Sequence, residues 1–486
     1  MIVVGFGSAG MTAAEFAAGL GLRVCVVERD RAGGDCLWTG CVPSKALVAA
    51  ARAAHVIRTA DRFGLRASMS SIDRVAVWSR VRAIRDEVAA GDDDPARFEA
   101  LGIAIRWGTG EIVGPHEVAV KDSQGAIEVV RGRMILICTG SRPSIPAIDG
   151  LEAVGFLTTD TLFDVTEVPA RVVFIGGGAV SIELAQACAR LGMSVTVLES
   201  APVVLAGEEP ELVAELERVL EREGVEVVTG VDIDRVSDGP VVHGVVDGER
   251  RQWATDAIVV AVGRTLDVDS LGLDAVGVTV REGAIAVDGR GRTSVDSIYA
   301  AGDVTGREMF THAAAHQAVM ALRDAFFPGR APNDSLVPWT TFTDPELAHV
   351  GLTSVEATAR FGGRRVRVHR WSLAHSDRAH TDRVEGSIVL VERVRFGRRR
   401  LVGAHVLSSH AGELIGELVF AIDRGMSVAD LGSLIHVYPT IATSIQQLGG
   451  RAALDEALKY RWMMKIARPR WHRLANRSSS RQRRSS

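Results

Sequence analysis

The sequence is short of cysteine and of long apolar runs, and it carries almost no excess of one charge. Five cysteines in 486 residues are too few for a secreted scaffold held by disulfides. No apolar run reaches the roughly 18 residues needed to cross a bilayer. A net charge of −4 gives no reason to expect nucleic acid as the main partner. Met1 leads almost directly into a glycine turn, without the apolar segment of a secretory signal. We therefore expect a cytoplasmic protein of several domains.

Glycine, by contrast, is abundant, and one cluster of it follows the first apolar strand. The cluster reads Gly5-Phe6-Gly7-Ser8-Ala9-Gly10, and an alanine-rich helix (11–19) and a strand (23–28) come after it. In this pattern the first glycine makes a tight turn, the second admits a pyrophosphate and the third lets helix pack on strand. Glu28, at the end of the second strand, is placed to hold ribose hydroxyls. Gly5, Gly7, Gly10 and Glu28 therefore predict a nucleotide site.

The same unit occurs a second time, about 170 residues later in the chain. A strand (172–175) leads into Gly176-x-Gly178-x-x-Ser181, and a helix and a strand ending in Glu199 follow. Serine replaces the third glycine, which is expected to loosen the helix–strand packing slightly. Glu199 would accept a hydrogen bond from a free 2′-hydroxyl and repel a 2′-phosphate, so we predict that NADH is preferred over NADPH.

Between and after these units the pattern changes several times. Residues 45–100 are predicted to be helical with an acidic break at 91–95, and residues 103–140 to alternate short strands and turns. Two apolar strands end in glycine turns that mirror each other, one at Thr139-Gly140 and one at Gly263. A further strand closes on Gly302-Asp303. Residues 338–450 read as strands and helices without a glycine fingerprint.

Two cysteines, Cys36 and Cys41, stand five positions apart and are followed by Val42-Pro43-Ser44-Lys45. In a reducing compartment such a pair is more often catalytic than structural. A dithiol beside a nucleotide-bound redox cofactor can pass two electrons onward. The pattern resembles the active-disulfide motif of the flavoprotein disulfide reductases, which include glutathione reductase, dihydrolipoyl dehydrogenase and mercuric reductase. The resemblance covers nearly the whole chain.

This resemblance implies an assignment for each nucleotide site. The N-terminal site would hold FAD and the central site the nicotinamide. Asp303 would bind the ribityl chain, Thr311 would contact the flavin pyrimidine edge through its backbone, and Gly110 would contact adenine. The remaining cofactor contacts are predicted at three turn residues: Thr139, Gly140 and Gly263.

The resemblance also implies roles in the redox chemistry. Cys36 would attack the substrate, and Cys41 would lie on the flavin side as a thiolate in charge-transfer contact. A helix start and a nearby cation would lower the pKa of that thiol. Lys45 matches the family's lysine near flavin N5, and Glu183 matches the acid that pairs with it.

The predicted fold class is α/β, with two Rossmann-like domains, one for FAD and one for NAD, and a C-terminal α+β dimerisation domain. Residues 1–150 and 264–332 are assigned to the FAD domain, 151–263 to the NAD domain, 335–450 to the dimerisation domain and 451–486 to a basic tail. In this family the partner chain completes each active site, so a homodimer is expected. The tail includes Trp462, Met463, Met464 and Trp471; we favour a solvated, disordered tail over contact with a membrane.

One motif departs from the family pattern. Disulfide reductases carry His-Pro-Thr-x-x-Glu near the C-terminus, but here Tyr438 takes the histidine position and Thr443 the glutamate position. His436 lies two residues away and could substitute only if the backbone turned differently. Mercuric reductases have a tyrosine at the matching place, so Tyr438 favours a reductase of that kind, with Hg(II) as acceptor.

Against that assignment, the vicinal C-terminal cysteines of mercuric reductases are missing, because the last cysteine is Cys188. No resident metal site is predicted. A dihydrolipoyl dehydrogenase or other disulfide reductase, a quinone reductase and a redox sensor therefore stay open as alternatives.

Overall fold

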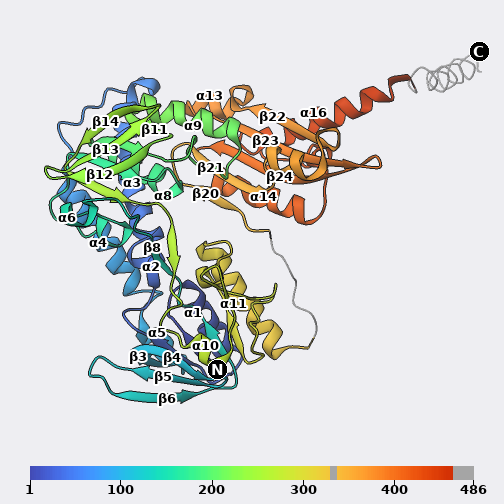
Figure 1. The fold of residues 1–486 in the computed structure, drawn as a ribbon. Coiled ribbons are helices and arrows are strands. Elements are labelled where there is room, and N and C mark those ends of the chain that lie inside the picture. The colour runs from blue at the N-terminus through green and yellow to red at the C-terminus, as the bar shows by residue number, and fades with distance from the viewer. Residues whose placement is uncertain (329–335, 463–486) are drawn as a thin grey trace, which may run out of the picture. The chain divides into compact units, whose positions relative to one another are not determined.

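The computed structural model describes residues 1–328 and 336–462. The chain divides into two compact units, Met1–Asp344 and Pro345–Ser486. The predicted α/β class is confirmed (Figure 1). Within the described ranges, no helix is long and apolar enough to cross a membrane.

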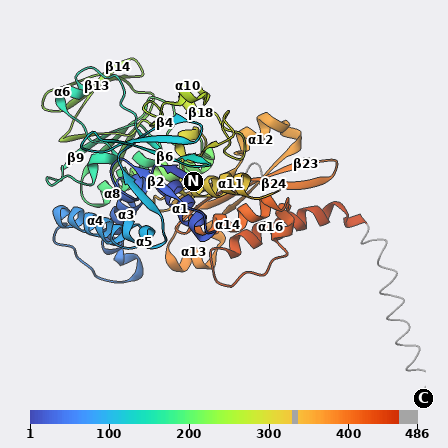
Figure 2. The same cartoon turned by 90° about the horizontal axis from the view of Figure 1, so that it is seen from below.

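The first nucleotide-binding unit is built on a five-stranded parallel sheet of order β19-β7-β1-β2-β3. Its strands are β1 (Ile2–Val4), β2 (Cys25–Glu28), β3 (Ala104–Trp107), β7 (Ile135–Ile137) and β19 (Ile298–Ala300). Helices α1 (Ser8–Gly19) and α11 (Thr311–Phe326) lie side by side and pack alanines into the core on one face of the sheet (Figure 1, Figure 2). Alanine lets two helices approach each other and the sheet closely.

The other face of this sheet is covered by a three-stranded antiparallel sheet. Its strands are β4 (Thr109–Gly114), β5 (Glu117–Lys121) and β6 (Ile127–Arg131). Val118 and Val120 alternate with outward-facing residues on β5, as expected for a strand with one buried face. The buried residues from both sheets form one apolar cluster.

Helices begin within the dithiol segment and continue to residue 100, but they are shorter than predicted. They are α2 (Gly34–Trp38), α3 (Cys41–Arg58), a 3-10 turn (Ala60–Phe63), α4 (Arg74–Ala89) and α5 (Pro95–Ala100). The prediction of a helix through residues 65–73 is wrong. Gly64 takes a left-handed conformation with φ 73°, which ends the helical turn, and three serines follow at 68, 70 and 71.

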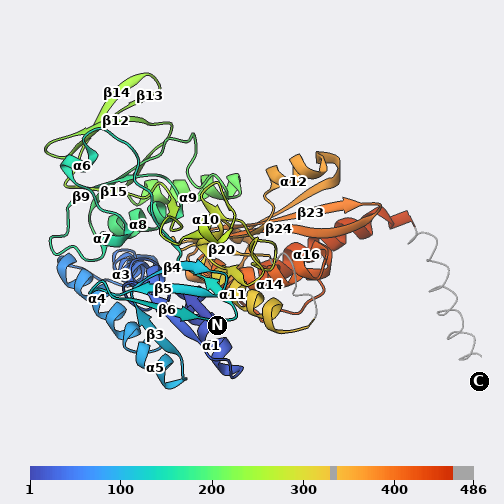
Figure 3. The same cartoon turned by 60° about the horizontal axis from the view of Figure 1, so that its bottom comes forward.

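The second nucleotide-binding unit repeats the plan with a four-stranded parallel sheet of order β11-β10-β9-β15. Its elements are β9 (Arg171–Ile175), α8 (Ala179–Arg190), β10 (Ser194–Leu198), α9 (Pro210–Arg222), β11 (Val225–Val228) and β15 (Ala257–Val260). An antiparallel sheet of β12 (Asp232–Ser237), β13 (Val241–Val246) and β14 (Glu249–Ala254) packs against it (Figure 3). Two short paired strands, β8 (Ser141–Pro143) and β16 (Arg264–Leu266), connect the two nucleotide-binding units.

Other short elements complete the first unit: α6 (Leu151–Val154), α7 (Thr159–Leu162), α10 (Leu273–Val276), β17 (Val280–Arg281), β18 (Ala284–Ile285), η2 (Asp303–Thr305) and β20 (Trp339–Thr341).

The second compact unit, which begins at Pro345, contains antiparallel strands in the order β21-β24-β23-β22. Its strands are β21 (Glu346–Gly351), β22 (Val366–Ser372), β23 (Ser387–Arg395) and β24 (Arg398–Ser408). Its helices are α12 (Ser354–Phe361), η3 (Gly363–Arg365), η4 (Leu373–His375), α13 (Asp377–Asp382), α14 (Ala411–Asp423), α15 (Val428–Leu431) and α16 (Thr443–Lys459). One apolar cluster joins the sheet to α14, α15 and α16.

Candidate active site

The first glycine turn has a backbone that only glycine can adopt. Gly5 has φ 101°, and a Cβ added there would lie 2.3 Å from the carbonyl oxygen of Cys138. Glu28 braces the turn, because its carboxylate accepts hydrogen bonds from the backbone N–H of Phe6 at 2.7 Å and of Asp30 at 2.8 Å. Gly7 is the N-cap of α1, so the first N–H groups of that helix face the turn. The arrangement suits a pyrophosphate.

The second glycine turn repeats this geometry almost residue for residue. Gly176 has φ 105°, and a Cβ there would lie 2.5 Å from the carbonyl oxygen of Ala261. Glu199 accepts hydrogen bonds from the backbone N–H of Gly177 and, at 2.7 Å, from that of Ala201. The acid predicted to hold ribose therefore lies at the turn in both units.

The third position of the fingerprint differs between the two turns. At Gly10 a Cβ would lie 2.0 Å from the carbonyl oxygen of Gly5, whereas Ser181 fits fully buried at the matching position. The Ser181 hydroxyl has no hydrogen-bond partner among the described residues. The second turn thus leaves room for a side chain that the first turn excludes.

The two cysteines of the predicted redox centre lie at neighbouring helix ends and are thiols in this structure. Cys36 lies on α2, and Cys41 is the first residue of α3. The Thr311 hydroxyl lies 3.4 Å from Cys41 Sγ. The interaction with the neighbouring Cys36 thiol first, and then the Thr311 hydroxyl and the charge of Lys45, lower the pKa of Cys41 to about 6 against partial desolvation. The same pairing raises the pKa of Cys36.

Two of the other three thiols are in a different environment. Cys138 and Cys188 are buried among apolar side chains, and burial raises the pKa of Cys138 and brings that of Cys188 to about 12. Cys36 is half-buried and Cys41 exposed. The structure therefore separates one polarised, accessible dithiol from inert core thiols.

Lys45 and Glu183, 138 residues apart, form the predicted ion pair. The Lys45 ammonium donates to both Glu183 oxygens, at 2.8 and 3.1 Å, and to Ser44 Oγ at 3.3 Å. Phe342, which the sequence reasoning missed, adds two further contacts. Its ring centre lies 4.2 Å from Lys45 Nζ, and its backbone N–H donates to Glu183 Oε2 at 3.1 Å. The ammonium group is therefore held from three sides.

Asp303, the predicted ribityl ligand, belongs to a polar cluster that the sequence reasoning did not foresee. Ser141 Oγ donates to Asp303 Oδ2 at 2.5 Å, and Arg264 Nε donates to Ser141 Oγ at 2.6 Å. Arg264 also pairs with Asp35, the residue before Cys36. Ser141 and Arg264 follow directly after Gly140 and Gly263, so the paired glycine turns were the available signal.

The remaining predicted cofactor positions lie just after strands β7 and β15 and on strand β4. Thr139 Oγ1 donates to the carbonyl of Asp267 at 2.9 Å. Gly140 and Gly263 have φ angles of 73° and 129°, which favour glycine. Gly110 is buried on β4, where a Cβ would lie 3.0 Å from Val27 Cγ1. Its glycine identity is therefore explained by packing alone.

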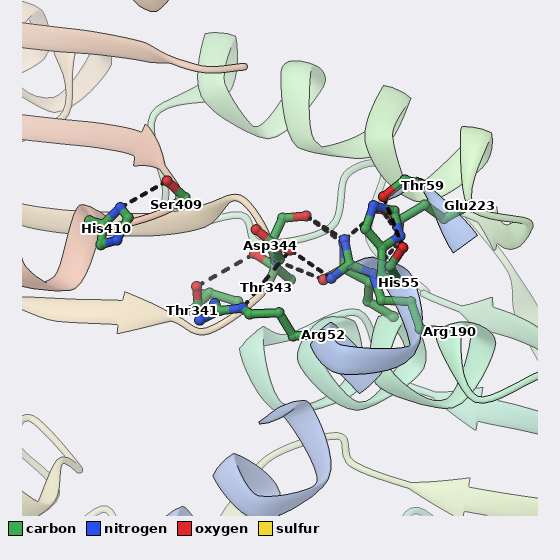
Figure 4. Close-up of polar contacts among 11 residues, drawn as sticks. Arg52, His55, Thr59, Arg190, Glu223, Thr341, Thr343, Asp344, Ser409 and His410 are labelled. Carbon is green, nitrogen blue, oxygen red and sulfur yellow. Dashed lines mark hydrogen bonds and ion pairs between the residues drawn. The ribbon is translucent and has the colours of Figure 1, made fainter. Parts of the chain in front are cut away.

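A buried network of ion pairs links α3, which begins at Cys41, to α8 (Figure 4). Arg190 makes two 2.7 Å hydrogen bonds to Glu223 and one of 2.7 Å to Asp344, with only 5% of its side chain exposed. His55, on α3, lies 3.9 Å from Glu223. Burial first, and the nearby Arg190 charge second, lower the pKa of His55. The network holds α3, which carries Cys41 and Lys45, against the helix that carries Glu183.

Tyr438 and His436, predicted on the acceptor side, turn to different acids within the second unit. Tyr438 is exposed, and its hydroxyl donates to Asp377 Oδ2 at 2.5 Å, which raises the pKa of Tyr438. His436 Nε2 lies 3.1 Å from both oxygens of Glu417. The His436 Nδ1 atom is buried and has no hydrogen-bond partner in the described part of the chain. Among the described residues, His436 therefore makes no hydrogen bond to Tyr438.

Comparisons with known proteins cover both units. A profile described as pyridine nucleotide-disulphide oxidoreductase matches residues 1–318, and the profile of its dimerisation domain matches residues 337–448. A dihydrolipoyl dehydrogenase from Chlorobaculum tepidum is 33% identical over 92% of this chain and 95% of its own. A mercuric reductase from Streptomyces lividans is 35% identical over 92% and 94%. The solved Cu(II) complex of the HOCl-induced flavoprotein disulfide reductase RclA from Escherichia coli is 27% identical, with a TM-score of 0.79 over 92% and 98% of the two chains.

Proposed function

This chain belongs to the pyridine nucleotide-disulphide oxidoreductase family, and from that premise we propose that it oxidises NADH and delivers the electrons through FAD and Cys36–Cys41 to a metal ion such as Hg(II). The coarser part of this statement, a flavoprotein oxidoreductase with a disulfide redox centre, follows from family membership. The acceptor, the preference for NADH over NADPH and the assembly into a homodimer are our proposals.

The residues of the first turn fit FAD. The positive φ angle at position 5 requires glycine. Gly34 lies so close to the turn that a Cβ added to it would be 2.7 Å from the Cα of Gly7. Neighbouring backbone atoms therefore exclude a side chain at either position, which keeps the turn tight at the N-terminus of α1, where a pyrophosphate would bind. When bound, FAD accepts reducing equivalents from the nicotinamide and reduces the disulfide. Glu28 and Asp303 would hold its ribose and ribityl hydroxyls, as the family resemblance implies.

The observation that carries the acceptor proposal is the pairing of Tyr438 with Asp377 where a disulfide reductase needs a base. Attack by Cys36 on a disulfide requires the thiolate, yet Cys41 takes the lower pKa of the pair and Cys36 the higher. A tyrosine whose pKa is raised is a poor base at neutral pH. A soft metal ion needs no such base, because it displaces the thiol proton when it binds.

Two relatives support a metal ion as acceptor. One is a mercuric reductase, and another has been solved as a Cu(II) complex. No cluster of three or more metal-ligating side chains occurs in residues 1–328 and 336–462. The ion would therefore be a passing substrate of the two thiols, with Tyr438 as an oxygen ligand contributed by a partner subunit.

A second candidate is reduction of a small disulfide, as in dihydrolipoyl dehydrogenase. Seven relatives, 31–34% identical to this chain, carry that name. The contact between His436 and Glu417 also favours it, since a histidine oriented by a glutamate is the acid–base pair that thiol exchange uses. His436 would first have to turn one nitrogen outward.

The test is anaerobic NADH oxidation with three acceptors: Hg(II) as a thiol complex, Cu(II), and lipoamide. We expect Hg(II) to stimulate NADH oxidation in wild type and not in Cys36→Ala. For each Hg(II) dithiolate reduced to Hg⁰, one NADH and one proton should be consumed and two thiols released. Tyr438→Phe should lower turnover with Hg(II), and His436→Gln, the matched control, should not. Faster turnover with lipoamide, lost in His436→Gln, would establish the second candidate instead. If no acceptor is turned over, a redox sensor becomes the better interpretation.

A further inference from the structure

The second unit carries a concentration of positive charge that the redox chemistry does not use. Residues 360–400 contain twelve arginines and four carboxylates, in a chain whose net charge is −4. Among the arginines on η3, β22 and the β23–β24 hairpin, six are exposed and form no ion pair with any carboxylate of residues 1–328 and 336–462. These six, the arginine surface, are Arg364, Arg365, Arg367, Arg395, Arg398 and Arg400.

Neighbouring elements bring the arginine surface together. Arg364 and Arg365 lie on η3, directly before β22, and Val366 on β22 pairs with Arg393 near the tip of the β23–β24 hairpin. Arg395 pairs with Arg398 across that tip. Figure 3 shows the hairpin and α16 at the same end of the second unit. The charges thus share one region instead of being scattered.

The hairpin tip carries Phe396, which neither turn geometry nor packing explains. Phe396 and Gly397 form a two-residue turn with φ angles of 49° and 78°, and Phe396 is 92% exposed. Such turns need positive φ at both positions, which asparagine, aspartate and glycine adopt readily and a bulky residue does not. The chain itself has the ordinary solution at the β13–β14 hairpin, where Asp247-Gly248 take 52° and 83°.

Beside the hairpin, α16 exposes an apolar stripe. Leu454 and Leu458 are one helical turn apart, Trp462 follows at the same spacing, and each is more than half exposed. The helix is fastened to the hairpin, because Arg399 forms an ion pair with Glu456. Lys459 lies close to these positive charges. Desolvation first, and then the charges of Arg367 and Arg399, lower the pKa of Lys459.

We propose that this region docks onto an anionic lipid bilayer, with the arginine surface on the headgroups and Phe396 in the interfacial layer. Clustered arginines give attraction to anionic lipid, and exposed aromatic and leucine side chains gain free energy by entering the headgroup boundary. Nucleic acid could pair its phosphates with the arginines and stack a base on Phe396, but it has no apolar surface that would bury Leu454 and Leu458.

The experiment is flotation of the full-length, FAD-loaded protein with phosphatidylcholine vesicles, with and without about 30% phosphatidylglycerol. We expect flotation only with the anionic vesicles, and weakening at high salt. The double variant R395E/R398E should bind at least ~10-fold more weakly. Phe396→Asn keeps the turn, because asparagine tolerates positive φ, and should weaken binding by ~5-fold or more. R250E/R251E, the same charge change on the β13–β14 hairpin, is the control and should float as wild type.

Three outcomes would overturn the proposal. The first is flotation unchanged in R395E/R398E, or absent in wild type. The second is tighter binding to an oligothymidylate than to anionic vesicles, which would make the partner nucleic acid. The third is a concentration-dependent rise in sedimentation coefficient that R395E/R398E abolishes, which would assign the region to a second copy of the chain. Retained FAD absorbance in each variant shows that the variant has folded.

Discussion

The Thr311 hydroxyl lies 3.4 Å from Cys41 Sγ, and replacing it tests how the protein prepares its thiolate. Thr311→Val removes the oxygen and keeps the branched shape of the side chain. A hydrogen bond to a charged group contributes about 1.5–3 kcal/mol, and 1.36 kcal/mol is about one pKa unit. Sulfur is a weak acceptor, and the interaction with Cys36 is the larger cause of the low pKa. We therefore take the lower end and expect the pKa of Cys41 to rise by about one unit.

The consequence is measurable near pH 6.5. With a pKa of about 6, roughly three-quarters of Cys41 is thiolate at that pH in wild type, and roughly one-quarter in Thr311→Val. Because the thiolate is the reactive form, the alkylation rate of Cys41 rises with pH through its pKa. The assay follows iodoacetamide labelling of the reduced protein from about pH 5 to pH 9, with the labelled peptide identified by mass spectrometry.

The control is Thr59→Val at the other end of α3, where the hydroxyl bonds to the carbonyl of His55 at 2.9 Å. It should leave the labelling profile of Cys41 unchanged. If Thr311→Val shifts the profile no more than Thr59→Val does, the threonine does not stabilise the thiolate, and the account of the low pKa is wrong.

Three further changes test other parts of the structure. Arg190→Met leaves the Glu223 and Asp344 carboxylates without their buried partner and should lower the free energy of unfolding by about 3–5 kcal/mol, measured by urea denaturation; a loss below about 1 kcal/mol would show that the network is dispensable. Glu199→Ala should raise the KM for NADH and weaken discrimination against NADPH, and an unchanged ratio of kcat/KM values would contradict the cofactor assignment. Gly5→Ala places a Cβ against a carbonyl oxygen and should abolish FAD retention on gel filtration.

Local sequence patterns predicted the two nucleotide-binding units well. Each needs a strand, a glycine with positive φ and a helix in register, and those requirements are visible over some thirty residues. The start of α3 was placed four residues too late, although Pro43 in its first turn was an available signal. The prediction of a helix through residues 65–73 was wrong because the hydrophobic pattern does not show that Gly64 adopts a left-handed conformation and ends the helical turn.

Long-range contacts were predictable only where the family resemblance supplied them. The Lys45–Glu183 pair spans 138 residues and was expected on that basis. Phe342 beside Lys45 and Ser141 beside Asp303 were not expected, because their partners are set by how the sheets and crossing strands pack. The exposure of Phe396 likewise depends on the register of the β23–β24 hairpin, which could not be predicted from the sequence. The predicted tail residues Met463, Met464 and Trp471 lie outside the described part of the chain.

The central claim is that the flavin and the Cys36–Cys41 pair act as one redox unit. Anaerobic titration of the purified protein with dithionite measures this most directly, by counting electrons taken up per subunit. The account predicts about four electrons in wild type, two for FAD and two for the disulfide, and about two in Cys36→Ser. Uptake of about two electrons in both proteins would show that the cysteines do not exchange electrons with the flavin, and it would contradict the account.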